Sequence, residues 1–184
     1  MDETTIISLN IMEQLYSCMK SYVENYLIYR TIKRQTHNLV LVDVTEMSFL
    51  KEISDACFQM CFIYWCNVFG SKDRNNPIHW SNFDIDVEEF FDQMGMNQGE
   101  FDSYAKEVKE FRNKYIAHPD GYNNRIPFLD KANKAIFVLD SILKDCDDVL
   151  PFGTLRDYFE ASYDKYDEIV CQIMVNCQRS SIID

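Results

Sequence analysis

The stretch from Phe111 to Asp120 holds the densest group of side chains able to do chemistry, namely Arg112, Asn113 and His118. An imidazole can accept or donate a proton near neutral pH. A guanidinium binds an anionic group through parallel hydrogen bonds, and an amide can orient either partner. Together these residue types suit proton transfer beside a bound anion.

A helix from Asn97 to about Ala117 is expected to carry this group, because apolar residues recur along it at spacings of three and four. The apolar seam consists of Phe101, Tyr104, Val108, Phe111 and Tyr115. At about 100° per residue, Arg112 and His118 fall about 70° to one side and about 50° to the other side of the seam's centre. We interpret a seam flanked in this way as one that packs against a partner or a second copy. Pro119 disfavours helical geometry at His118, which places the imidazole on the last turn, among carbonyl groups that favour its protonated form.

Each of these residues also has a purely structural interpretation. An arginine on the shoulder of a helix commonly pairs with a nearby acid, and a histidine before proline commonly caps the helix. Asp120 lies in the turn sequence Pro-Asp-Gly, which favours a turn role over a catalytic one. Lys114 projects away from the seam, so a solvated lysine is the default and contact with a phosphate is the alternative.

Helical periodicity dominates the chain, and no segment alternates convincingly as a strand does. The expected helices cover residues 5–35, 45–69, 86–94, 97–117, 127–150 and 154–176. A capping box, Asp86 with Glu89, opens the short third helix, and a polar loop over residues 70–84 precedes it. We therefore predict an all-α fold in one domain, residues 1–184, built as an antiparallel bundle of five main helices and one short helix.

The composition excludes several classes of function. The 184 residues include 18 Lys and Arg against 30 Asp and Glu, a net charge of −12, which excludes a broad basic platform for nucleic acid. Hydrophobic residues make up 47%, so disorder is not expected. With five glycines, and neither a dinucleotide-binding nor a phosphate-loop motif, Rossmann and P-loop sites are excluded.

The location expected from the sequence is the cytoplasm. The first residues, Met1 to Glu3, are acidic where a signal peptide would be basic, and the longest apolar run, Cys61 to Cys66, is far too short for a membrane span. Seven cysteines, an odd number, suit free thiols in a reducing compartment.

The string Arg-Asn-Lys-Tyr-Ile-Ala-His-Pro-Asp, residues 112–120, resembles a known motif. Arg112 followed by Asn113 and, four residues later, by His118 is similar to the R-x(4–6)-H motif of the HEPN superfamily. Lys114, Ala117 and Asp120 extend the likeness to the abortive-infection branch, in which an R-[DN]-K-x-x-A-H-x-D pattern recurs. The motif covers about ten residues, and an all-α bundle of this size with the motif near the end of a late helix also fits.

The resemblance implies a homodimer in which two motif helices meet and form one composite cleft. Family members of this kind are metal-independent endoribonucleases, which implies a toxin or anti-phage effector that needs no cofactor and acts on RNA, with neither DNA nor membrane as partner. His118 would accept the 2′-hydroxyl proton or protonate the leaving 5′-oxygen, and Arg112 would hold phosphoryl oxygens. In part of the family a tyrosine two residues after the histidine is modified to silence the toxin. Asp120 stands there in this chain.

Two other functions remain open at this stage. One is a non-catalytic HEPN-like module that binds a nucleotide or a protein partner in the same polar cleft. The other is a structural helical domain, which a monomer with the seam buried inside it would favour. Residues 140–184 hold ten acids and four bases, which suggests either a small or structured RNA target or a basic partner that docks on this acidic face. A cognate antitoxin or another protein partner also stays open.

Other residues with chemical potential receive mainly structural interpretations. Residues 25–42 contain no acid, and their cations Arg30, Lys33 and Arg34 could contact an RNA backbone, with a solvated face as the alternative. Cys57, Cys61 and Cys66 lack the spacing of a zinc site and are expected to be buried. Asp84, Asp86 and Glu88 suit helix capping better than cation binding, and no metal is expected. His79 and Trp80 could contact a ligand, although Trp80 is expected to anchor its loop.

Overall fold

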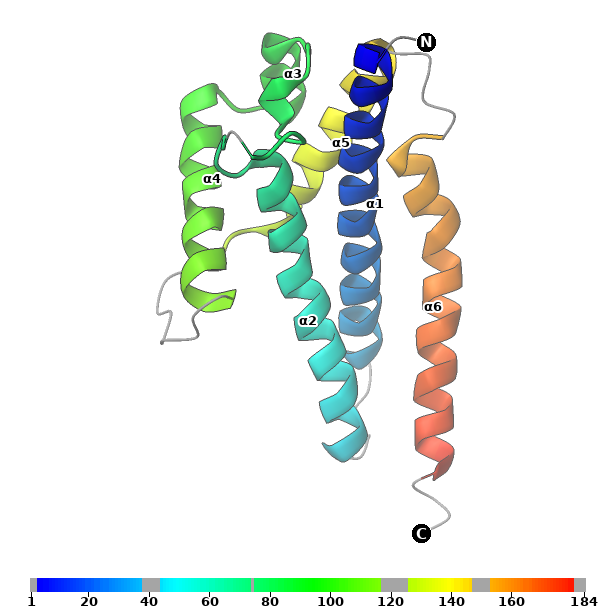
Figure 1. Ribbon diagram of the computed structural model, residues 1–184. Helices are drawn as coiled ribbons and strands as arrows, with labels where there is room; N and C mark the ends of the chain where they lie inside the picture. Colours follow the sequence, from blue (N-terminus) through cyan, green and yellow to red (C-terminus); the bar gives the residue numbers. More distant parts are fainter. Residues whose placement is uncertain (1–2, 38–43, 74, 117–125, 147–152, 181–184) are drawn as a thin grey trace.

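The structure is a computed structural model, and it describes residues 3–37, 44–73, 75–116, 126–146 and 153–180. Its helices are α1 (Glu3–His37), α2 (Val44–Phe69), α3 (Val87–Met94), α4 (Gln98–Phe111), α5 (Leu129–Cys146) and α6 (Leu155–Ser180) (Figure 1). A 3₁₀ turn, η1 (Trp80–Asn82), precedes α3, and a π-helical turn, η2 (Arg112–Ile116), continues α4. The part of the chain described here contains no strand, so the all-α prediction is confirmed, with five long helices and one short one.

The long helices alternate in direction along the chain, as Figure 1 shows for α1, α2, α4, α5 and α6. Because the fifth helix of such a series points the same way as the first, α6 lies parallel to α1. In the contacts between them, residue numbers increase in the same order on both sides. Tyr16 donates to the Gly153 carbonyl oxygen, which lies just before α6, and Tyr158 donates to Glu24. Farther along both helices, Arg34 pairs with Asp167. Consecutive long helices are thus antiparallel, and the first and the fifth of them, α1 and α6, run parallel.

Helix α2 supplies the centre of the main core. Phe62, Trp65 and Phe69 are almost fully buried and pack against aromatic rings of α4. Phe111 sits edge-on to Phe62 with ring centroids 4.9 Å apart. Edge-on aromatic pairs contribute a favourable interaction energy beyond that of burying their surface area, so this packing holds α4 firmly against α2.

The helix starts follow the side chains that cap them. The amide oxygen of Asn97 accepts a hydrogen bond from the Glu100 backbone N–H, and the Glu100 carboxylate accepts one from the Asn97 backbone N–H. This full capping box opens α4. At α3, Asp86 caps the Glu89 N–H as expected, but the Glu89 side chain accepts from Gln93 instead of returning to Asp86. The sequence therefore predicted the α3 cap correctly and its reciprocal bond incorrectly.

Helix α6 is attached to the bundle by a second, smaller core and by buried polar contacts. Ile32, Leu50, Val170 and Met174 form the small core between α1, α2 and α6. At the start of α6, the buried carboxylate of Asp140 accepts a 2.7 Å hydrogen bond from the Leu155 N–H. No described helix combines the length and apolar character needed to cross a membrane.

Candidate functional site

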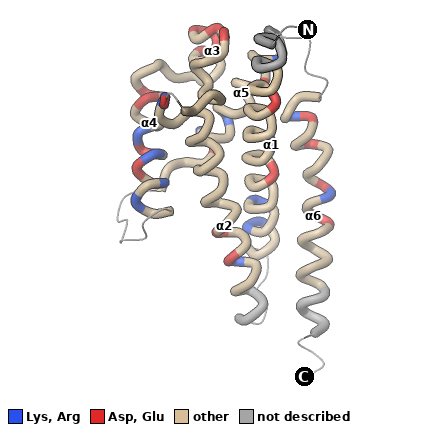
Figure 2. The backbone as a smooth tube through the Cα atoms, in the orientation of Figure 1, with Lys and Arg blue, Asp and Glu red and all other residues tan. Residues whose placement is uncertain are grey.

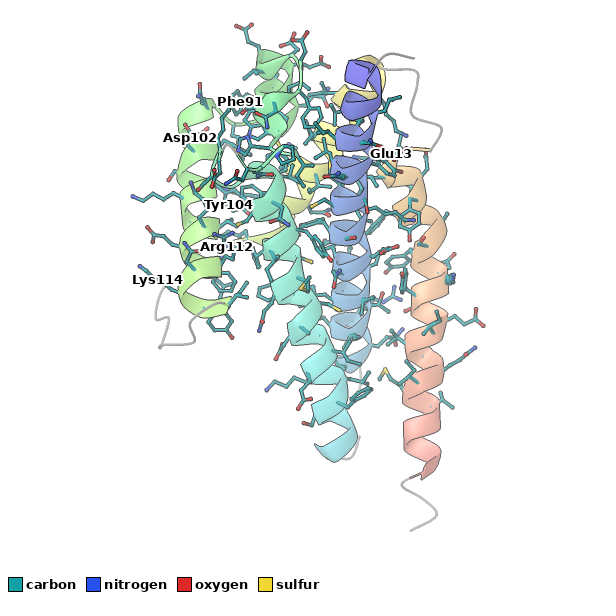
Figure 3. The ribbon with its side chains drawn as sticks, viewed as in Figure 1. Glu13, Phe91, Asp102, Tyr104, Arg112 and Lys114 are labelled. Atoms are coloured by element: carbon teal, nitrogen blue, oxygen red, sulfur yellow. The ribbon has the colours of Figure 1, made fainter. Side chains whose placement is uncertain are left out.

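Arg112 and Asn113 lie where α4 passes into the π-helical turn. The Nε and Nη2 atoms of Arg112 both donate to the Asn113 amide oxygen, at 3.0 and 2.8 Å. Arg112 is half-buried and lies on the side of α4 that faces α2, whereas Lys114 points away from the bundle (Figure 3). Asn113 thus fixes one edge of the guanidinium and leaves the Nη1 and Nη2 edge with N–H donors to spare.

Among the described residues, no carboxylate lies within ion-pair distance of Arg112. Arg34 shows the contrast, because it pairs with Asp167 and also contacts the Tyr163 hydroxyl. The structural alternative for Arg112, a pairing with a nearby acid, therefore finds no partner in the described part of the chain. An arginine in this state can bind an incoming anion without first breaking an ion pair.

Lys109, one turn before Arg112, adds a second positive charge beside the same buried surface. Both cations act on Cys66 of α2, and burial nevertheless raises the pKa of the Cys66 thiol to about 11. A thiol with that pKa is protonated at neutral pH and is a poor nucleophile. Sequence reasoning did not single out Lys109, although its i, i+3 spacing to Arg112 indicates a shared face. Figure 2 shows acidic residues near the start of α4 and basic residues interleaved with acidic ones in its second half.

The apolar seam of α4 faces the interior of this chain. Phe101, Tyr104, Val108 and Phe111 are buried, at most 3% exposed. The interpretation of the seam as a face for a partner is therefore wrong, because rings of α2 already cover it. Tyr115, the fifth expected member, is 41% exposed and stacks on Phe111 with centroids 5.0 Å apart. The π turn holds more residues than an α turn, which shifts Tyr115 out of the seam.

The remaining motif residues divide into one that is described and three that are not. Lys114 is exposed and its ammonium lies 3.9 Å from the Glu110 carboxylate, which agrees with a solvated lysine. Ala117, His118 and Asp120 lie outside the described residues. The pairing of Arg112 with His118 therefore stays a prediction.

The three cations of the basic run are separated by the fold. Arg34 is occupied by Asp167 of α6, so the prediction of a phosphate contact loses support at that residue. Arg30 and Lys33 instead border a 390 Å³ cavity beside Asp130 at the start of α5. Lys33 also lies over the ring of Tyr29.

The side chains given structural interpretations behave accordingly. Cys57, Cys61 and Cys66 are buried. Trp80 packs on Phe69, Phe90 and Phe101 and so anchors its loop. His79 is buried, which lowers its pKa; its Nδ1 accepts from the Ser81 N–H and its Nε2 donates to the Gly70 carbonyl oxygen. Within the described ranges, no three His, Cys, Asp or Glu side chains gather as metal ligands do.

Comparison of the chain with protein-family models, with curated proteins and with solved structures finds no match.

Proposed function

We propose that this protein is a metal-independent endoribonuclease of the HEPN kind, which acts as a toxin or anti-phage effector. The observation that carries the proposal is the state of Arg112: its guanidinium is held on one edge by Asn113 and has no carboxylate partner among the described residues. In a chain with 30 acidic residues, such an arginine is a suitable place for a phosphate group. The π-helical turn beneath it is a local feature often found at functional sites.

The proposed reaction is an internal transfer on RNA. His118 takes the proton of the 2′-hydroxyl, the 2′-oxygen bonds to phosphorus, and the bond from phosphorus to the 5′-oxygen breaks. A protonated histidine, from the same or the second copy, supplies the proton of the leaving 5′-oxygen. Arg112 holds the phosphoryl oxygens as negative charge builds on them, while Asn113 keeps the guanidinium in place. The products are a 2′,3′-cyclic phosphate and a 5′-hydroxyl.

A composite site requires a dimer that does not use the seam of α4. Exposed apolar side chains lie within the motif and shortly after it in sequence: Tyr115 is in the motif, and Ile126 and Phe128 follow it. The Phe128 carbonyl accepts a 2.7 Å hydrogen bond from the buried Tyr104, so the backbone there is fixed while the ring is 52% exposed. We assign the dimer contact to this end of the bundle, and Arg30 and Lys33 serve as contacts to the RNA backbone.

The deciding experiment is RNA cleavage in the presence of EDTA. The wild-type protein should cleave single-stranded RNA and leave cyclic phosphate ends, whereas Arg112→Ala and His118→Ala should be inactive. Lys106→Ala is the matched control, because it removes an exposed cation from the same helix. Arg112→Lys keeps the charge but loses the forked geometry, so it should also lose most activity.

The non-catalytic module, which binds a nucleotide or a protein partner, is the second candidate. The internal position of the seam of α4 counts against both this module and the ribonuclease, and it favours the structural helical domain. The non-catalytic module is the correct reading if the purified protein leaves varied RNAs intact while the two alanine variants fold and bind partners normally. A protein that is also monomeric in solution would instead indicate a structural helical domain.

A further inference from the structure

A polar cavity of about 650 Å³ opens between α1, α5 and α6, and neither Arg112 nor Asn113 lines it. Three cations border it, one from each helix: Arg30 of α1, Lys134 of α5 and Arg156 of α6. The volume lies within the usual range for small-molecule sites. The cavity is therefore large enough for a metabolite and separate from the proposed catalytic residues.

The charges of the cavity favour an anion. Its two acids are Asp130 and Asp140, and the Asp140 carboxylate is already committed to the Leu155 N–H, with its pKa raised by burial. None of the three cations has an ion-pair partner among the described residues. Lys134 donates to the Met94 carbonyl oxygen at 2.8 Å, which holds its ammonium in place and leaves other N–H donors for a ligand.

The aromatic side chains of the cavity have faces that are already covered. Tyr26 stacks on Tyr22, and the Arg156 guanidinium lies 5.7 Å from the centroid of the Phe137 ring. A nucleobase stacks on an open ring face, and each of these two rings already has a neighbour. Amide and hydroxyl groups line the wall instead, from Asn133 and Ser141. Such groups recognise the hydroxyls of a sugar.

We propose that this cavity binds a phosphorylated polyol, that is, a sugar phosphate. Arg156 and Lys134 hold the phosphate, Arg30 adds to the positive field, and the amide and hydroxyl wall holds the sugar. The ribose phosphate of an RNA 5′ end has the same chemistry, so the free and the polymeric source must be told apart. The site contains neither Arg112 nor Asn113, and it shares Arg30 with the proposed contacts to the RNA backbone.

Titration calorimetry with ribose 5-phosphate, ribose, inorganic phosphate and AMP tests the assignment. We expect ribose 5-phosphate to bind most tightly and ribose to bind at least tenfold more weakly. Arg156→Gln should weaken ribose 5-phosphate about tenfold or more, because it removes a charge-assisted contact. Lys165→Gln is the control, since it removes an exposed cation from the same helix outside the cavity, and it should leave the affinity unchanged. Ser141→Ala tests the sugar wall without changing charge, and should weaken ribose 5-phosphate but not inorganic phosphate.

Several results would overturn the proposal. One is that ribose 5-phosphate does not bind at millimolar concentration. Another is that Lys165→Gln loses as much affinity for ribose 5-phosphate as Arg156→Gln does. A third is that Arg156→Gln, with unchanged thermal stability, loses no affinity. AMP binding more tightly than ribose 5-phosphate would show that a base is read. A 5′-phosphorylated RNA oligomer that binds more tightly, and does so through Arg156, would assign the cavity to an RNA end.

Discussion

Replacing Asn113 with aspartate tests how Arg112 is held and what it binds. The Asn113 amide oxygen lies 3.0 Å from Nε and 2.8 Å from Nη2, so a carboxylate at this position would form an ion pair with the guanidinium. An exposed pair contributes up to about 1 kcal/mol. An RNA phosphate would then meet a neutralised arginine, and about 1 kcal/mol corresponds to about a fivefold change in affinity.

The assay is cleavage of a short oligoribonucleotide in EDTA, with kcat and KM measured separately. We expect Asn113→Asp to lower kcat/KM about fivefold, mainly through a higher KM. Asn113→Ala leaves the charge of Arg112 free but its orientation unfixed, so its loss should fall on kcat. Gln98→Glu is the control, because it adds the same charge at the exposed start of the same helix.

The outcome that refutes this reasoning is specific. If Asn113→Asp cleaves RNA as efficiently as the wild type while Arg112→Ala is inactive, then Arg112 acts but does not bind the phosphate through the guanidinium that Asn113 holds. If the Gln98→Glu control loses as much activity as Asn113→Asp, the effect is a general repulsion of RNA by added charge.

Three further predictions concern the fold and the assembly. Phe111→Ala should lower the free energy of unfolding by about 3–5 kcal/mol in urea denaturation, whereas Tyr115→Ala, at an exposed ring, should cost about 1 kcal/mol or less. Gln35 and Arg34 hold the pKa of Asp167 below its usual value. The contribution of Asp167 to stability is therefore present above about pH 4 and is lost as the pH falls through the lowered pKa. In Asp167→Asn, the acid side of the curve of stability against pH should be flatter than in the wild type, and an unchanged curve would contradict the assignment. Phe128→Ser should convert a dimer to a monomer in analytical ultracentrifugation without unfolding the chain, and a dimer that survives would place the contact elsewhere.

The sequence predicted the helices well because their signals are local. Spacings of three and four mark the buried faces, and the Asn97 and Asp86 caps mark two starts. The position of Tyr115 was mispredicted, because nothing local distinguishes a π turn from an α turn at Arg112. The ion pair of Arg34 could not be predicted either, because its partner Asp167 lies on α6, more than a hundred residues later in the chain.

The same distinction between local and distant signals explains why the net charge of −12 is a poor guide to the site. Arg34 is neutralised by Asp167, whereas Arg112 has no carboxylate partner among the described residues, although both are arginines of the same acidic chain. From Lys106 to Lys114 the chain carries four cations and two acids, Glu107 and Glu110. Lys114 forms an exposed ion pair with Glu110. Three cations remain: Lys106 is exposed, and Lys109 and Arg112 act on Cys66 of α2 and so lie on the side toward that helix. A phosphate repelled by the molecule as a whole would therefore find attraction only at short range, where the Debye length in physiological salt, about 8 Å, limits the reach of the distant acids.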